Sequence, residues 1–148
     1  MASNFATAMK ALTVEFEKTT AHHVVLSFGS TGKHYAQIKN GAPFDVFMAA
    51  DIERPRLLET QGLAQTDSRM TYARGKLILW TSKSGMDDIK NTLLIGQDFR
   101  HLAVANPKLS PYGLAAQQVM IKLDVWPRLQ PKLVRGENIA QTFQFVHS

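Results

Sequence analysis

The sequence has no cysteine and no long apolar run, and both absences narrow what the protein can be. Without cysteine, the chain of 148 residues can form no disulfide bond and no thiolate metal site. No apolar stretch approaches the roughly 20 residues that a membrane-spanning helix needs. The first residues lack the basic and then apolar segments of an export signal, so we expect none in this chain. The remaining composition is that of a globular protein and leaves the compartment open.

The basic residues are too scattered to predict a nucleic-acid surface. Seventeen lysine and arginine residues against twelve acidic ones give a formal net charge of +5, which draws in anions generally. Surfaces that bind nucleic acid concentrate such charge in a stripe with interleaved aromatic side chains. The lysines here stand singly along the chain. We therefore expect no nucleic-acid partner, and a weak, salt-sensitive nucleic-acid binder is the least favoured alternative.

The hydroxyl and histidine residues do not form the usual catalytic or metal-binding patterns. The run Gly29-Ser30-Thr31-Gly32 lacks the Gly-x-Ser-x-Gly spacing of a serine nucleophile, and no hydroxyl follows Lys33 as a Walker A loop requires. His22 and His23 are adjacent, so on a strand they would point to opposite faces and could not share a metal. His34 and the remaining histidines have no ligand partner at metal spacing. We expect neither an enzyme nor a direct cation site.

Apolar periodicity predicts helices and strands that alternate along the chain. Apolar residues recur at helical spacing over residues 5–18, with Ser3 or Asn4 as the helix cap. Further helices are predicted at 31–39, in a short segment after Asp51, at 112–123 and at 138–145, and strands at 23–28, 44–49, 75–80, 102–105 and 132–134. Strands separated by single helices indicate parallel βαβ units, in which ligands bind beyond the carboxyl ends of the strands.

Four polar turns coincide with predicted helix N-termini. They are Ser3-Asn4, Ser30-Thr31, Pro111-Tyr112-Gly113 and Glu137-Asn138-Ile139. The first N–H groups of a helix have no partner within it, and the helix dipole adds partial positive charge there. Uncharged donors that meet in one cleft are typical of a site that binds a small dehydrated oxyanion. Taken alone, Ser30 or Thr31 is more simply interpreted as a helix cap.

Several longer segments together match one known family in their order along the chain. They are Asn4-Phe5 and residues 28–33, 37–51, 68–80, 105–113 and 136–141. In this order they resemble the periplasmic molybdate-binding proteins of ABC-type importers. The resemblance implies an α/β fold of two-lobed type II binding-protein architecture with parallel-rich sheets. It also implies a periplasmic location, a membrane permease as partner, and molybdate or tungstate as ligand with no cofactor besides.

The resemblance assigns the oxyanion ligands to particular residues. Thr31 matches a position that is usually serine, and Ile139 could act only through its main-chain N–H, because its side chain is apolar. Without the resemblance, Ile139 would be interpreted as ordinary helix packing. The complete expected set is Ser3, Asn4, Ser30, Thr31, Tyr112, Asn138 and Ile139.

Compared with that family, the chain looks incomplete at both ends. Residues 1–76 would form lobe I without its first strand and C-terminal return, and residues 77–148 would form lobe II without its C-terminal part, with a polar loop at 82–88 near the change of domain. Uncovered sheet edges and helix faces would favour a homo-oligomer through dimerisation or strand exchange. The main alternative is therefore a fragment without ligand affinity that persists as a packing or dimerisation module.

Overall fold

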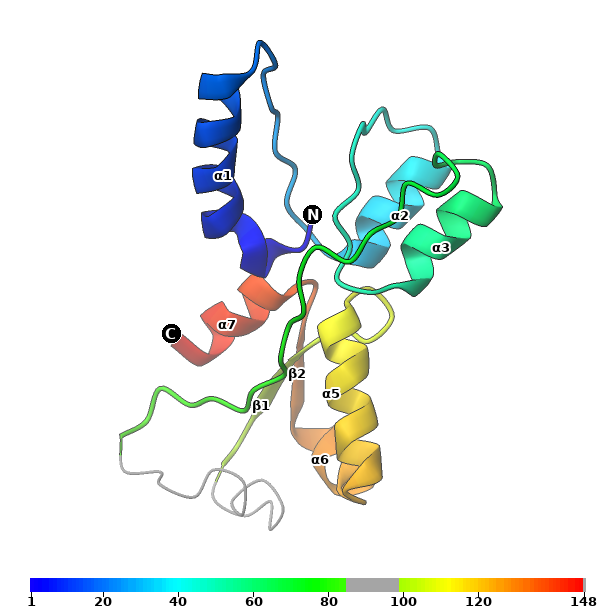
Figure 1. Ribbon diagram of the computed structural model, residues 1–148. Helices are drawn as coiled ribbons and strands as arrows, with labels where there is room; N and C mark the ends of the chain where they lie inside the picture. Colours follow the sequence, from blue (N-terminus) through cyan, green and yellow to red (C-terminus); the bar gives the residue numbers. More distant parts are fainter. Residues whose placement is uncertain (85–98, 148) are drawn as a thin grey trace. The chain divides into compact units, whose positions relative to one another are not determined.

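The computed structural model describes residues 1–84 and 99–147 and divides the chain into two compact units, Met1–Met70 and Thr71–Ser148 (Figure 1). The loop predicted at 82–88 lies partly outside the described residues. The assignment of residues 1–76 and 77–148 to lobes I and II stays a prediction. Among the described residues, no helix is both long and apolar enough to pass through a membrane.

The first unit is built from helices whose ends are set by local signals. It contains the 3-10 helix η1 (Ser3–Phe5), α1 (Ala6–Thr19), α2 (Thr31–Lys39) and α3 (Glu53–Thr60). The helix predicted over residues 31–39 is confirmed residue for residue. It stops where Gly41 takes a φ of 84°, a left-handed conformation that favours glycine. Helices α2 and α3 lie side by side, with Leu58 of α3 fully buried.

The predicted side-chain cap of the first helix is wrong. Ala2 precedes η1 and Phe5 precedes α1, and neither helix start has a side-chain cap hydrogen bond. The reason is that the chain enters α1 through a 3-10 turn that already contains Ser3 and Asn4. Both residues therefore lie inside the helical run instead of ahead of it.

The strands predicted at 23–28, 44–49 and 75–80 are also wrong. These segments are extended but belong to no strand, and the predicted burial of 44–49 is not observed. Val25 is 86% exposed, and Val46 and Ile78 are each 77% exposed. A strand forms only where a neighbouring strand completes its hydrogen bonds. Within the described part of the first unit, parallel pairing is limited to a bridge between Ala2 and Gly29.

The second unit contains the parallel βαβ arrangement that the sequence predicts. Strand β1 (Leu102–Ala105) pairs in parallel with β2 (Leu133–Gly136), and Ala105 faces Gly136 at their carboxyl ends. The crossover runs through α5 (Pro111–Lys122), α6 (Trp126–Leu129) and the 3-10 helix η2 (Gln130–Lys132), and α7 (Ile139–His147) follows β2. Short α6 and η2 were not predicted. The apolar core gathers Val104, Met120, Val125 and Leu129.

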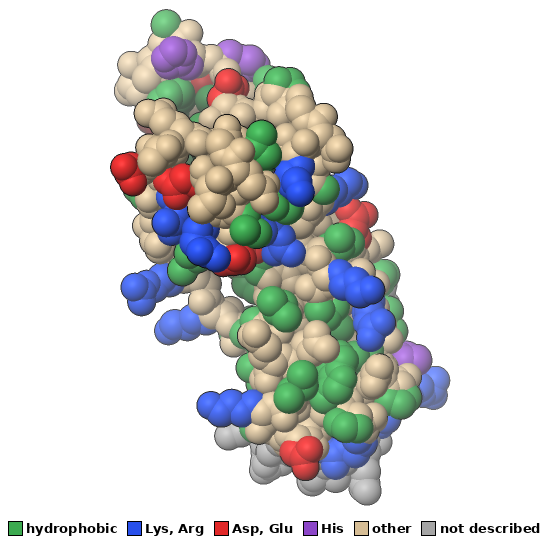
Figure 2. All heavy atoms as spheres, turned by 90° about the vertical axis from the view of Figure 1, so that its right-hand side faces the viewer, with side chains coloured by type: hydrophobic (Ala, Val, Ile, Leu, Met, Phe, Trp, Pro, Cys, Tyr) green, Lys and Arg blue, Asp and Glu red, His purple; other side chains and the backbone are tan. Residues whose placement is uncertain are grey.

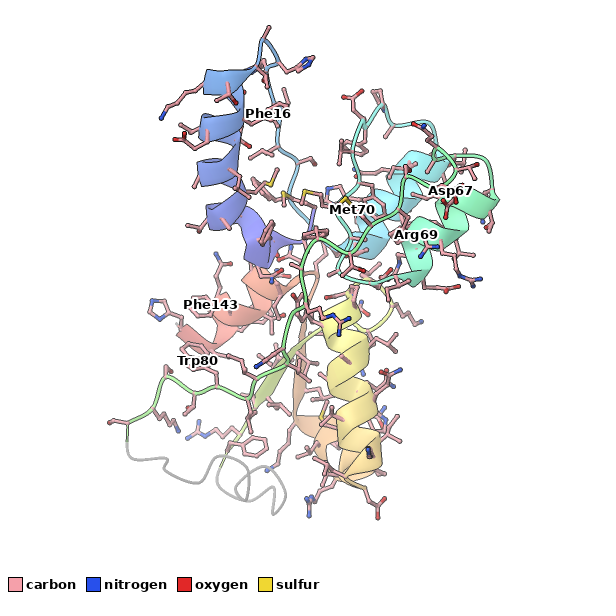
Figure 3. The ribbon with its side chains drawn as sticks, viewed as in Figure 1. Phe16, Asp67, Arg69, Met70, Trp80 and Phe143 are labelled. Carbon is pink, nitrogen blue, oxygen red and sulfur yellow. The ribbon has the colours of Figure 1, made fainter. Side chains whose placement is uncertain are left out.

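An aromatic stack joins the extended segment of the second unit to α7. The rings of Trp80 and Phe143 are stacked with their centroids 4.9 Å apart (Figure 3). Nearby, the hydroxyl of Ser82 donates a hydrogen bond to the main-chain oxygen of Val146 at 2.8 Å. The segment is therefore held to α7 by side chains in place of a strand ladder.

Candidate functional site

The turn at Ser30 and Thr31 is buried and its hydroxyls are hydrogen-bonded. Ser30 caps α2, because its hydroxyl oxygen accepts from the backbone N–H of Lys33 at 3.3 Å. The hydroxyl oxygen of Thr31 accepts from the backbone N–H of Ala50 at 3.1 Å. The two residues are only 3% and 1% exposed. Accepting these bonds does not use the hydroxyl protons, so each hydroxyl can also donate to a ligand.

The start of the chain lies directly beside this turn. The parallel bridge between Ala2 and Gly29 is supported by the N–H of Gly29, which donates to the main-chain oxygen of Met1 at 3.0 Å. Because Ser3 follows Ala2 and Ser30 follows Gly29, the bridge brings two of the predicted ligand turns together. The structure thus groups Ser3 and Asn4 with Ser30 and Thr31 in the first unit.

The N-terminus of α5 is pressed against the end of β1. A Cβ atom on Gly113 would lie 2.0 Å from the main-chain oxygen of Ala105, so only glycine fits. Tyr112 precedes this contact, and a Cβ on Gly75 would lie 2.9 Å from the Tyr112 hydroxyl oxygen. Burial, and to a smaller extent the neighbouring Tyr112, raises the pKa of the Tyr72 phenol. Two phenols of this unit therefore lie near each other.

The turn before α7 is a helix cap. The side-chain oxygen of Asn138 accepts from the N–H of Gln141 at 3.1 Å, and its main-chain oxygen accepts from the hydroxyl of Thr142 at 2.9 Å. The side chain of Gln141 in turn accepts from the N–H of Glu137, the residue before this cap, at 2.6 Å. Ile139 is the first residue of α7, so the helix itself supplies no partner for its N–H.

Tyr112 and Ile139 belong to one end of the second unit. Their helices begin after β1 and β2, whose carboxyl ends are joined by a hydrogen bond from the N–H of Asn106 to the main-chain oxygen of Gly136 at 2.7 Å. The predicted ligand residues thus form two groups, one in each unit. That both groups bind one anion stays a prediction.

Sequence reasoning missed one residue of the first unit, His34, which it treated as isolated. The ring is buried, and Nδ1 lies 3.0 Å from the main-chain oxygen of Ser30. The spacing of four residues between the cap and this histidine was the available signal, because residues four apart on a helix share a face. Burial lowers the pKa of His34, which favours a neutral ring at neutral pH.

The predicted ligands include no charged side chain. On the face drawn in Figure 2, lysine and arginine side chains lie among acidic, hydrophobic and uncharged ones. Within residues 1–84 and 99–147, no group of three or more histidine, aspartate or glutamate side chains could hold a metal ion. The donors that the predicted ligand residues offer to an anion are neutral hydroxyl, amide and backbone groups.

Comparison with known proteins places the chain in a family. Residues 1–148 match the family described as bacterial extracellular solute-binding protein. The chain is 50% identical over 146 residues to the molybdate-binding protein ModA of Azotobacter vinelandii and 43% identical over 145 residues to that of Rhodobacter capsulatus. These matches cover 99% and 98% of the chain but only 58% and 57% of the relatives, so the chain spans little more than half their length.

A solved structure agrees with this assignment. The periplasmic molybdate-binding protein of Azotobacter vinelandii superposes with a TM-score of 0.91 at 43% identity, over 98% of this chain and 64% of that one. The similarity confirms the predicted α/β binding-protein fold, of which this chain represents a part. The chain belongs to the family of bacterial extracellular solute-binding proteins.

Proposed function

We propose that the chain binds a tetrahedral oxyanion, molybdate or tungstate, and delivers it to the permease of an ABC-type importer in the periplasm. One observation carries the proposal. The bridge between Ala2 and Gly29 joins the turn at Ser3 to the turn at Ser30, in a chain that is 50% identical to a molybdate-binding protein. The anion is cargo, so the proposal includes no cofactor and no catalytic residue.

The first unit would supply most of the side-chain donors. The hydroxyls of Ser30 and Thr31 stand at the N-terminus of α2, where the helix dipole and the first backbone N–H groups favour an anion. Ser3 and Asn4 would add donors from the adjoining turn. Neutral donors select an anion by its size and by the number of bonds it can accept, whereas a lysine or arginine would attract many anions of suitable charge.

The second unit would complete the coordination. Tyr112 would donate from its phenol and Ile139 from its backbone N–H at the start of α7. Since the side-chain oxygen of Asn138 is used as the helix cap, Asn138 would act mainly by fixing the direction of the neighbouring N–H. Closure of two lobes over the anion would then be the signal that the permease recognises.

Calorimetric titration of this chain tests the proposal. We expect molybdate and tungstate to bind with micromolar or tighter affinity and the smaller sulfate and phosphate to bind much more weakly, because neutral donors select an anion by its size. The absence of heat with all four anions would refute the proposal and support the alternative of a non-binding module. Binding of DNA that weakens steeply with salt would instead support the nucleic-acid alternative.

The dimerisation alternative is tested separately, because Val25, Val46 and Ile78 are exposed on extended segments. Monomers rarely leave such apolar segments open. Sedimentation velocity over a range of concentrations decides whether self-association accompanies anion binding. A monomer at all concentrations would remove this alternative.

A further inference from the structure

We infer that His34 is a positioning residue for the anion site, fixing the peptide group between Ser30 and Thr31 from inside the protein. The inference rests on the proposed function, because it concerns how well that site is pre-formed. The ring itself does not contact the anion. It acts through the main chain of the turn.

Polar contacts at both ring nitrogens hold the ring against the turn. Nδ1 lies 3.0 Å from the main-chain oxygen of Ser30, Nε2 lies 3.1 Å from the hydroxyl oxygen of Ser27, and the Met1 amino nitrogen lies 3.5 Å from Nε2. A carbonyl oxygen can only accept, so Nδ1 must carry the proton. In the neutral ring Nε2 is then the acceptor, and the Ser27 hydroxyl donates to it. The imidazole therefore ties together both sides of the turn.

Packing confines the ring to this position. Its centroid lies 5.7 Å from that of Phe44, with the two rings edge to face. On the other side, a Cβ on Gly29 would lie 3.0 Å from Cε1 of His34, so the ring rests against bare backbone. With 3% of His34 exposed, water competes little for the two hydrogen bonds.

The bond to Ser30 has a direct consequence for a ligand. The main-chain oxygen of Ser30 and the N–H of Thr31 belong to one planar trans peptide group and point in opposite directions. The Ser30 oxygen accepts from the backbone N–H of His34 at 3.2 Å, and the bond from Nδ1 holds it a second time, so the N–H of Thr31 is directed away from the ring. That N–H is one of the backbone donors proposed for the anion, and a donor fixed beforehand loses less entropy on binding.

The same helix provides a model for a conservative replacement. Asn40 donates from its side-chain nitrogen to the main-chain oxygen of Ala36, four residues earlier, at 2.8 Å. Asn40 is the C-cap of α2, and an asparagine at position 34 would have the same four-residue spacing from Ser30. His34→Asn can therefore restore the bond to the Ser30 oxygen, while His34→Leu fills a similar volume without any donor.

The experiment compares these two variants with the parent chain in calorimetric titrations with sodium molybdate. We expect His34→Leu to weaken binding about tenfold, the effect of losing one buried hydrogen bond that orders a donor, and His34→Asn to recover most of that loss. As a control, Leu58→Val removes buried volume in α3 at a residue outside the predicted ligand set, and it should leave the affinity of the folded protein unchanged. Circular dichroism confirms that each variant is folded.

The outcomes separate the inference from the proposed function. If the parent chain binds molybdate and His34→Leu binds equally well, His34 is an ordinary core residue and the inference alone fails. If His34→Asn binds no better than His34→Leu, the bond to Ser30 is not responsible and the inference also fails. If the parent chain binds neither molybdate nor tungstate, the proposed function fails and this inference with it. Nitrogen chemical shifts of the ring give a second check, since a proton on Nε2 alone would overturn the assignment.

Discussion

Replacing Thr31 with valine removes one hydroxyl and almost nothing else. Both side chains are branched at Cβ and similar in volume, so the packing around residue 31, which is 1% exposed, should be preserved. The hydroxyl that is lost has one observed role and one proposed role. It accepts from the backbone N–H of Ala50 at 3.1 Å, and it would donate its proton to the oxyanion.

The two roles predict two separate losses. Leaving the N–H of Ala50 without its acceptor should lower the free energy of unfolding by about 1 kcal/mol, because that N–H is only partly buried and water can reach it in part. Deleting a donor to a charged ligand should cost about 1–3 kcal/mol of binding free energy. This corresponds to a loss of affinity between about fivefold and about 150-fold.

Urea unfolding measures the first loss and titration with molybdate measures the second. Thr31→Ser is the matched control, because it keeps the hydroxyl and should retain most of the affinity. If Thr31→Val binds molybdate as tightly as the parent chain while its unfolding free energy falls, the hydroxyl serves only the bond to Ala50. That result would refute its role as a ligand.

Three further predictions concern single positions. Burial lowers the pKa of His34 below its ordinary value of 6.5, and the charges of the Met1 amino group and Lys33 add to this. Because the unfolded chain binds the proton at a higher pH than the folded protein, stability present above about pH 6.5 should be lost as the pH falls. Urea unfolding at about pH 7.5 and about pH 5 should show a smaller loss of unfolding free energy for His34→Asn than for the parent chain. The buried hydroxyl of Thr13 has no hydrogen-bond partner among the described residues, so Thr13→Val should raise the free energy of unfolding by about 1 kcal/mol, and an unchanged or lower thermal midpoint would contradict this. Gly113→Ala places a Cβ 2.0 Å from the Ala105 oxygen and should cost about 3 kcal/mol or prevent folding, whereas a midpoint like that of the parent chain would show that α5 can move.

The helices could be predicted from the sequence because their signals are local. Ser30 caps α2 and Gly41 terminates it within the same short stretch of chain, so no distant residue is needed. The βαβ unit around β1 and β2 was predictable from the alternation of apolar segments with helices, which is typical of parallel pairing. The segment at 23–28 has the apolar residues of a strand, but a ladder needs a neighbour, and residue types alone do not show which neighbour is present.

The candidate site was only partly predictable. The polar turns could be found from their position before helices, but the bond from the N–H of Ala50 to Thr31 joins residues far apart in the sequence, and no local pattern indicates it. The sequence analysis likewise named Asn138 only as a ligand, whereas its side chain caps α7. Only the packed structure distinguishes a hydroxyl or amide that is already used from one that can still donate.

The unpaired segments change what holds the anion site in place. In a complete sheet, ladder hydrogen bonds would fix the chain on both sides of the turn at Ser30. In the described part of the first unit, residues 23–28 and 44–49 form no strand, and the turn is held by individual contacts such as the bridge at Gly29, the bond from Ala50 to Thr31 and the ring of His34. Because such individual contacts stand in place of a ladder, the loss of one should affect affinity more than it would in a turn supported by strands. The sensitivity of molybdate binding to His34 and Thr31 should therefore exceed its sensitivity to core substitutions in α3.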